Sequence, residues 1–211
     1  MEIIVTTLEI IGAIAFAVSG ALVGIRKNMD VFGVCVLGLS TAVGGGVIRD
    51  LILGETPPAM FTNPIYAIAG LATCLFVLIP AIRTMVERSE FVFLLADAVG
   101  LGIFTASGTM HALATADANA FLAVFVGVVT GVGGGLLRDV MASVPPYIFT
   151  KHVYAVASIA GGILLCVIYP YVDKYIGLFI TSAFVVVLRL LASRFRWEIP
   201  KAEDESLHHT K

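Results

Sequence analysis

The amino-acid sequence predicts an all-α integral membrane protein with seven transmembrane helices, arranged as two inverted three-helix repeats plus a seventh helix. Three observations support this fold class. Hydrophobic residues make up 59% of the 211-residue chain and charged residues only 13%, whereas a soluble domain is nearer half apolar and a quarter charged. Long apolar runs recur along the chain, and the second half of the sequence repeats motifs of the first.

The apolar runs give the helices in order. A helix needs about 20 apolar residues to cross the hydrocarbon core of a bilayer. The first run is longer than the apolar core of a signal peptide and no basic leader precedes it, so we interpret it as a retained span. The predicted spans are residues 3–25, 31–53, 63–85, 91–110, 118–142, 151–171 and 175–193.

Lysine and arginine are unevenly distributed over the predicted loops. Nine lie in the first, third and fifth loops and the C-terminal tail, whereas Lys174 is the one basic residue on the opposite side. Cytoplasmic loops of membrane proteins carry the excess of basic residues. We therefore expect a multi-pass protein of the cell inner (plasma) membrane, with the N-terminus outside and the C-terminus cytoplasmic. The nine residues are Arg26, Lys27, Arg83, Arg88, Lys151, Arg194, Arg196, Lys201 and Lys211.

The internal repeat accounts for the first six of the seven predicted helices. At an offset of 88 or 89 residues, three blocks of the first half match three blocks of the second. Each repeat contains three predicted spans, and an odd number makes the second copy enter the membrane from the opposite side. The matched blocks are FAVSGA (16–21) with FTASGT (104–109), VGGGVIRDL (43–51) with VGGGLLRDV (132–140), and PPAMF (57–61) with PPYIF (145–149).

These boundaries divide the chain into four parts. The predicted first repeat covers residues 1–88 and the inverted second repeat covers residues 89–172. The seventh helix, residues 173–194, lies outside the repeat, and a polar cytoplasmic tail follows over residues 195–211.

Two glycine triplets, Gly44–Gly46 and Gly133–Gly135, fall near the middle of the second and fifth predicted spans. Small residues allow close helix packing, but three consecutive glycines at symmetric places favour a bend or an unwound turn. Exposed carbonyls are tolerated inside a membrane only against protein or water, and they are natural cation ligands. Ser19 and Ser107 offer hydroxyls in the first and fourth spans, which either coordinate an ion or bond their own helix backbone.

Each glycine triplet is followed by an arginine and an aspartate. Because a charge inside a membrane needs a partner, we predict two symmetric clusters at similar depths from opposite faces. The clusters either fix helix register or guard the two mouths of a path. They are Arg49 with Glu9 and Asp50, and Arg138 with Asp97 and Asp139.

Other chemistries have little support in the sequence. The glycine motifs lack the spacing of a dinucleotide or phosphate loop, and no catalytic constellation accompanies the paired acids. Cys35, Cys74 and Cys166 lie in apolar runs without C-x-x-C spacing, and the net charge of −2 does not suggest nucleic-acid binding. We expect no enzyme activity, no cofactor and no metal site beyond transient monovalent cations.

The doubled V-G-G-G-x-x-R-D motif followed by P-P-x-x-F resembles the prokaryotic trimeric intracellular cation (TRIC) channels. The resemblance covers roughly residues 5–171. It implies a homotrimer in which each subunit has its own pore, lined by the second and fifth helices bent at their glycines. It also implies conduction of potassium and sodium, with membrane lipid as a further partner.

Two features limit this resemblance. Eukaryotic members carry a lysine-glutamate-valine motif after the second-helix glycines, linked to inositol-lipid binding, and here that stretch is Val47-Ile48-Arg49-Asp50. Related bacterial sequences are also labelled glycine transporters. The alternatives are therefore a secondary transporter of a small amino acid such as glycine, with Arg49 or Arg138 binding the carboxylate, or a scaffold whose glycines only pack helices.

Overall fold

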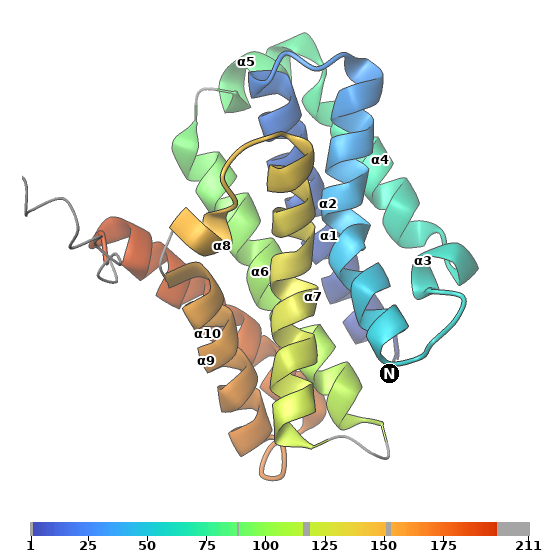
Figure 1. Ribbon diagram of the computed structural model, residues 1–211, viewed down its shortest axis with the longest axis vertical. Helices are drawn as coiled ribbons and strands as arrows, with labels where there is room; N and C mark the ends of the chain where they lie inside the picture. The colour runs from blue at the N-terminus through green and yellow to red at the C-terminus, as the bar shows by residue number, and fades with distance from the viewer. Residues whose placement is uncertain (1, 88, 116–118, 151–152, 198–211) are drawn as a thin grey trace, which may run out of the picture.

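The structure is a computed structural model and describes residues 2–87, 89–115, 119–150 and 153–197. Within these residues the chain is all helical (Figure 1). Five helices are long and apolar enough to cross a membrane: α1 (Glu2–Arg26), α2 (Val31–Ile52), α6 (Glu90–Leu113), α7 (Ala120–Met141) and α10 (Lys174–Arg194). The shorter helices are α3 (Ala59–Thr62), α4 (Ile65–Val77), α5 (Pro80–Val86), α8 (Tyr147–Thr150) and α9 (Val153–Ile168).

Side-chain caps set the beginning of four long helices, and at α10 the cap is Asp173, which accepts from the Tyr175 backbone N–H at 2.9 Å. Asp30 accepts a 2.7 Å hydrogen bond from the Gly33 backbone N–H before α2, and Asn119 accepts one of 2.9 Å from Leu122 before α7. Ser89 caps α6 in the same way. An oxygen at the N-cap satisfies a backbone donor that has no partner within the helix. The apolar runs and these caps together place the five long helices close to the predicted spans.

The third predicted span, residues 63–85, is not one straight helix. It consists of α4 and α5, which meet at an angle of 88°. Pro80 stands at the start of α5, and because proline lacks a backbone N–H and clashes with the preceding turn, a helix does not continue straight through it. α9 has 16 residues and is shorter than the span predicted over residues 151–171, of which 151 and 152 lie outside the described residues. Most of the predicted polar tail, residues 198–211, also lies outside them.

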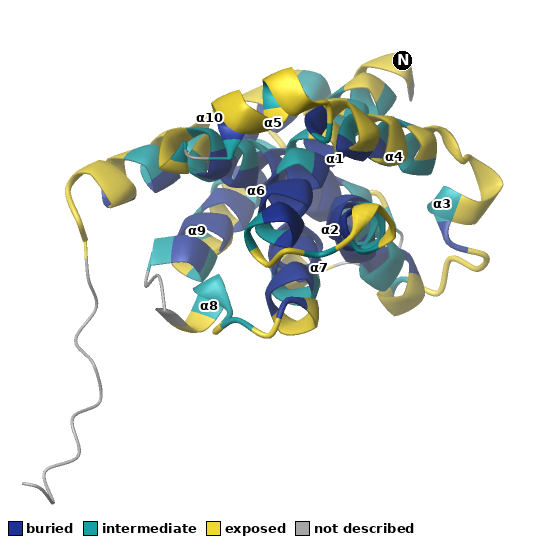
Figure 2. Cartoon of the chain, turned by 90° about the horizontal axis from the view of Figure 1, so that it is seen from above, coloured by how far each residue is buried: buried dark blue, intermediate teal, exposed yellow. Residues whose placement is uncertain are grey.

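α1 and α6 run in opposite directions. Arg26 at the end of α1 forms a 3.1 Å ion pair with Glu90 at the start of α6, and the rings of Phe16 and Phe104 stack at 5.4 Å between the same helices. α2 and α7 also lie antiparallel. Seen from above, these four helices carry most of the buried residues, whereas the outer faces of α4, α5 and α10 are exposed (Figure 2).

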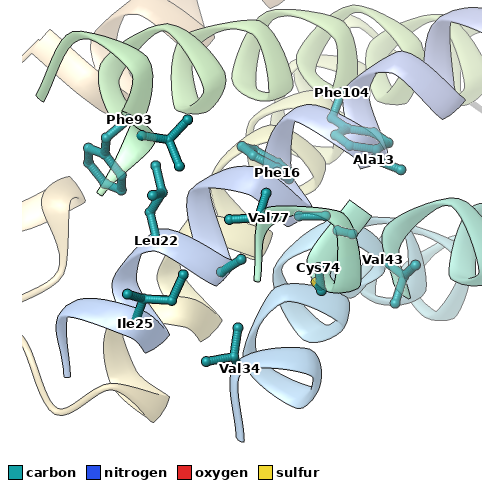
Figure 3. Packing of buried hydrophobic residues seen from close by; sticks show 14 residues of the cluster. Ala13, Phe16, Leu22, Ile25, Val34, Val43, Cys74, Val77, Phe93 and Phe104 are labelled. Atoms are coloured by element: carbon teal, nitrogen blue, oxygen red, sulfur yellow. The ribbon is translucent and has the colours of Figure 1, made fainter. Parts of the chain in front are cut away.

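A continuous apolar core holds the first half against α6. Leu22, Phe16 and Phe104 are buried together with Cys74 and Val77 of α4 (Figure 3). Large apolar side chains also cover the outside of the bundle, which suits a surface that faces lipid.

Candidate functional site

The two glycine triplets lie where α2 and α7 cross. A side chain at Gly45 would overlap the carbonyl oxygen of Thr130, and one at Gly134 would overlap the carbonyl oxygen of Thr41. A Cβ at Gly133 would lie 3.3 Å from the Cα of Gly45. The backbones of the two helices are therefore in direct contact, which small residues allow in membrane helices.

Neither triplet unwinds its helix. α2 is helical throughout Val31–Ile52 and α7 throughout Ala120–Met141, so the unwound turn is wrong, whereas the bend at the glycines stays a prediction. The backbone of the neighbouring helix occupies the space that a side chain at Gly45 or Gly134 would take. Gly46 differs from Gly45. A Cβ at Gly46 would meet nothing within 4 Å, and Gly46 lines a small cavity.

The first charge cluster joins α1, α2 and α4. Arg49 Nη1 lies 3.0 Å from Glu9 Oε1, and Arg49 Nε lies 2.8 Å from Asp50 Oδ1. The Tyr66 hydroxyl donates to Glu9 Oε2 at 3.0 Å, and the Ala59 backbone N–H donates to Asp50 Oδ2 at 2.7 Å. The last bond ties the start of α3 to the end of α2.

This cluster lines a cavity of about 30 Å³, room for one or two water molecules. Glu9 is the most exposed member of the cluster, with 13% of its side chain accessible. The charged groups lining the cavity are two carboxylates and one guanidinium, so the cavity has an excess of negative charge.

The second charge cluster repeats this arrangement in α6 and α7. Arg138 Nη1 lies 2.6 Å from Asp97 Oδ1, and Arg138 Nε lies 2.8 Å from Asp139 Oδ1. The Tyr147 backbone N–H donates to Asp139 Oδ2 at 2.9 Å, as Ala59 does to Asp50.

The second cluster is closed. The side chains of Arg138 and Asp97 are both 0% exposed, and the Arg138 guanidinium lies 5.0 Å from the centre of the Phe93 ring. Arg138 also donates a hydrogen bond to Ser19 of α1, which links this cluster to the first half of the chain. Ser107, the counterpart of Ser19, is buried and its hydroxyl has no hydrogen-bond partner among the described residues.

The two clusters differ because α10 reaches only the second. Arg189 Nη2 lies 3.9 Å from Asp97 Oδ2, and the Arg189 guanidinium lies 4.8 Å from the centre of the Tyr154 ring. With Arg189 the second cluster has two arginines and two carboxylates. Sequence analysis did not assign Arg189 a role, although a lone arginine inside the last apolar run was a signal for one.

Comparisons with known proteins identify relatives of this chain. A protein-family model described as Glycine transporter matches residues 6–81 and 94–170. The UPF0126 inner membrane protein YadS of Escherichia coli (strain K12) is 36% identical over 192 residues, which cover 91% of this chain and 92% of YadS.

Two solved structures share the fold. One, reported as the structural basis for conductance through TRIC cation channels, has 35% sequence identity and a TM-score of 0.86, covering 95% of this chain and 98% of that chain. The other is the TRIC trimeric intracellular cation channel orthologue from Rhodobacter sphaeroides, with 32% identity and a TM-score of 0.84, covering 92% and 98%. The chain belongs to the prokaryotic TRIC channel family. The family predicted from the doubled V-G-G-G-x-x-R-D motif is thereby confirmed.

This TRIC family member is a multi-pass membrane protein. The two segments matched by the family model run from α1 into α5 and from α6 to the end of α9, so each contains one glycine triplet and one arginine–carboxylate cluster. α10, which carries Arg189, lies outside both segments.

Proposed function

We propose that the chain forms a passive monovalent cation channel, permeable to potassium and sodium, with an ion path along α2 and α7 in each subunit. The observation that carries this proposal is the negatively charged cavity beside the α2–α7 crossing, in a fold shared with TRIC cation channels. An acidic cavity raises the local concentration of cations at the entrance of a path.

The proposed architecture has seven spans in two inverted halves. α4 with α5 forms the third span, α9 the sixth and α10 the seventh. The antiparallel arrangement of α1 with α6 supports an inverted repeat, because an odd number of spans reverses the second copy. In this arrangement the two clusters lie toward opposite membrane faces, with the glycine crossing between them. We infer that the N-terminus is outside and the C-terminus cytoplasmic.

The two clusters then have different roles. Glu9 and Asp50 outnumber Arg49 and favour cation entry at the first cluster. A buried arginine repels cations, so conduction past the second cluster requires Arg138 and its carboxylate partners to rearrange. The second cluster is therefore the proposed gate, and its buried ion pairs hold the closed state.

Self-association into a homotrimer is part of the proposal. The solved relative from Rhodobacter sphaeroides is described as trimeric. Large apolar side chains remain exposed on the outer helix faces of the single chain, and they suit either lipid or a neighbouring subunit.

A planar bilayer experiment tests the proposed function. Purified protein under a potassium gradient is expected to give discrete unitary currents whose reversal potential follows the potassium equilibrium potential. The Glu9→Gln variant is expected to carry a smaller potassium current, because it removes the excess negative charge of the cavity. Glu87→Gln is the matched control, since Glu87 lies away from the cavity and pairs with Arg83 on the surface.

Two outcomes would contradict the channel. One is the absence of unitary currents together with saturable glycine uptake into proteoliposomes, which would favour a secondary transporter. The other is an equal loss of current in the Glu9 and Glu87 variants, which would mean that the cavity charge has no special part in conduction.

A further inference from the structure

We propose that a groove between α6 and α10 binds an anionic phospholipid, with its phosphate headgroup held by arginines at the end of α10 and just after it. The groove has a volume of about 1000 Å³ and lies between the start of α6 and the last turns of α10. It is separate from the cavity at the first cluster. Its size is at the upper end of the range found for small-molecule pockets, roughly 300–1,000 Å³.

The lining of the groove is positively charged. Three arginines, Arg189, Arg194 and Arg196, line it together with one carboxylate, Glu90. Glu90 already pairs with Arg26 at 3.1 Å, so its charge is neutralised from outside the groove. Arg189 is balanced by the carboxylates of the second cluster, so the excess positive charge of the groove is that of Arg194 and Arg196. This charge complements an anion, and the guanidinium fork binds phosphate oxygens through two parallel hydrogen bonds.

Arg189 supplies an independent indication of a ligand. Only 5% of its side chain is exposed, and its Nε has no hydrogen-bond partner among the described residues. Arg189 Nη2 lies 3.9 Å from Asp97 Oδ2, which is too far for a hydrogen bond. Buried polar groups are nearly always hydrogen-bonded. The Arg189 guanidinium is thus short of acceptors at the inner wall of the groove.

The end of α10 is shaped toward the groove. Arg196 has a positive φ of 51°, and the backbone N–H of Trp197 bonds to the carbonyl of Ala192 at 3.0 Å. This pattern is a helix C-cap that reverses the chain direction. It brings Arg196 and Trp197 back to line the groove, where the last turns of α10 extend beyond the bundle (Figure 2).

The depth of the groove suits a lipid rather than a soluble anion. α10 has 21 residues and is about 30 Å long, the thickness of the hydrocarbon core. Arg194 and Trp197 therefore stand at the level of the headgroups, where tryptophan is enriched. Phe91, Val187 and Leu191 expose apolar surface along the same groove, against which an acyl chain can pack.

Lipid retention by the full chain tests this proposal. Wild-type protein in bilayer nanodiscs containing equal amounts of phosphatidylglycerol and phosphatidylcholine is transferred to detergent, and the retained lipid is quantified by native mass spectrometry. Wild type is expected to retain phosphatidylglycerol selectively. The Arg194→Gln/Arg196→Gln variant is expected to bind it at least about tenfold more weakly. Lys27→Gln/Arg83→Gln is the matched control, since it removes the same charge outside the groove.

Two further variants keep the test independent of folding. Arg194→Lys/Arg196→Lys retains the charge and is expected to keep most of the binding, whereas Val187→Trp fills the groove without changing charge and is expected to lose it. Inorganic phosphate alone is expected to give no thermal stabilisation.

The proposal is overturned if wild type retains no phosphatidylglycerol, if the control loses as much as the groove variant, or if Val187→Trp keeps full retention. Loss of the trimer in Val187→Trp with lipid unchanged would instead assign this face to a second copy of the chain. Channel currents are not a readout, so failure here leaves the proposed function standing.

Discussion

At the residue scale, Arg49 and Arg138 have corresponding carboxylate partners but different surroundings. The ion pair of Arg138 with Asp97 is inaccessible to solvent, whereas the pair of Arg49 with Glu9 borders a cavity. Removing one partner of a buried pair leaves an uncompensated charge, and this costs about 3–5 kcal/mol. We expect Arg138→Gln to destabilise the fold by roughly this amount and Arg49→Gln by clearly less. The apparent midpoint of thermal unfolding in detergent measures both.

The control for this comparison is Arg83→Gln. Arg83 forms an exposed pair with Glu87, and such pairs contribute about 0–1 kcal/mol. A coupling free energy near zero between Glu9→Gln and Arg49→Gln in a double-mutant cycle would contradict the contact seen here. Equal losses for Arg49 and Arg138 would contradict the difference in burial.

At the element scale, the crossing of α2 and α7 depends on individual glycines. Gly45→Ala and Gly134→Ala place a methyl group against a backbone carbonyl, which cannot move as a side chain can. Overpacking of this kind costs about 1–3 kcal/mol. We expect each variant to lower the thermal unfolding midpoint, because α2 and α7 must move apart to make room for the methyl group. We also expect each variant to reduce the potassium current, because this movement distorts the proposed ion path along the two helices.

Gly46→Ala tests the same argument from the other side. A Cβ at Gly46 meets nothing within 4 Å, and alanine favours a helix over glycine by about 1 kcal/mol. We therefore expect Gly46→Ala to leave stability unchanged or slightly raised. If the unfolding midpoint of Gly46→Ala falls as far as that of Gly45→Ala, any substitution in the triplet destabilises the fold, and the overlap with the neighbouring backbone is not the cause.

The helices also show which features a sequence can predict. The bounds of α2 and α7 were predictable because an apolar run and a capping residue mark each of them. The bend between α4 and α5 was missed because hydropathy stays high on both sides of Pro80, although the proline itself was a signal. The unwound turn favoured at the glycines was wrong because the same three residues also permit close packing, and the contact with the other half decides between the two.

At the scale of the whole molecule, α10 breaks the symmetry of the two halves. Pairing the arginines with acids was predictable from matched depths in the repeat, but the approach of Arg189 to Asp97 was not, because it depends on how α10 packs on α6. Tyr66 donates to Glu9, whereas the equivalent Tyr154 lies under Arg189 with its hydroxyl unpaired among the described residues. One end of the proposed path consequently borders an acidic cavity, and the other is neutral and closed.

Which of these two ends faces the outside of the cell depends on the orientation of the whole chain in the membrane. Labelling at two lysine positions tests this orientation. Lys27 follows α1 and Lys174 begins α10, and both are exposed. In a variant whose three cysteines are replaced by alanine, Lys174→Cys is expected to react with a membrane-impermeant maleimide on intact cells, because the side poor in basic residues faces outward. Lys27→Cys is expected to react only after the membrane is permeabilised, and the cysteine-free variant provides the background. The reverse labelling pattern would place the N-terminus in the cytoplasm. The acidic cavity at Glu9 would then be the cytoplasmic entrance of the path, and the groove of α10 would face the outer leaflet.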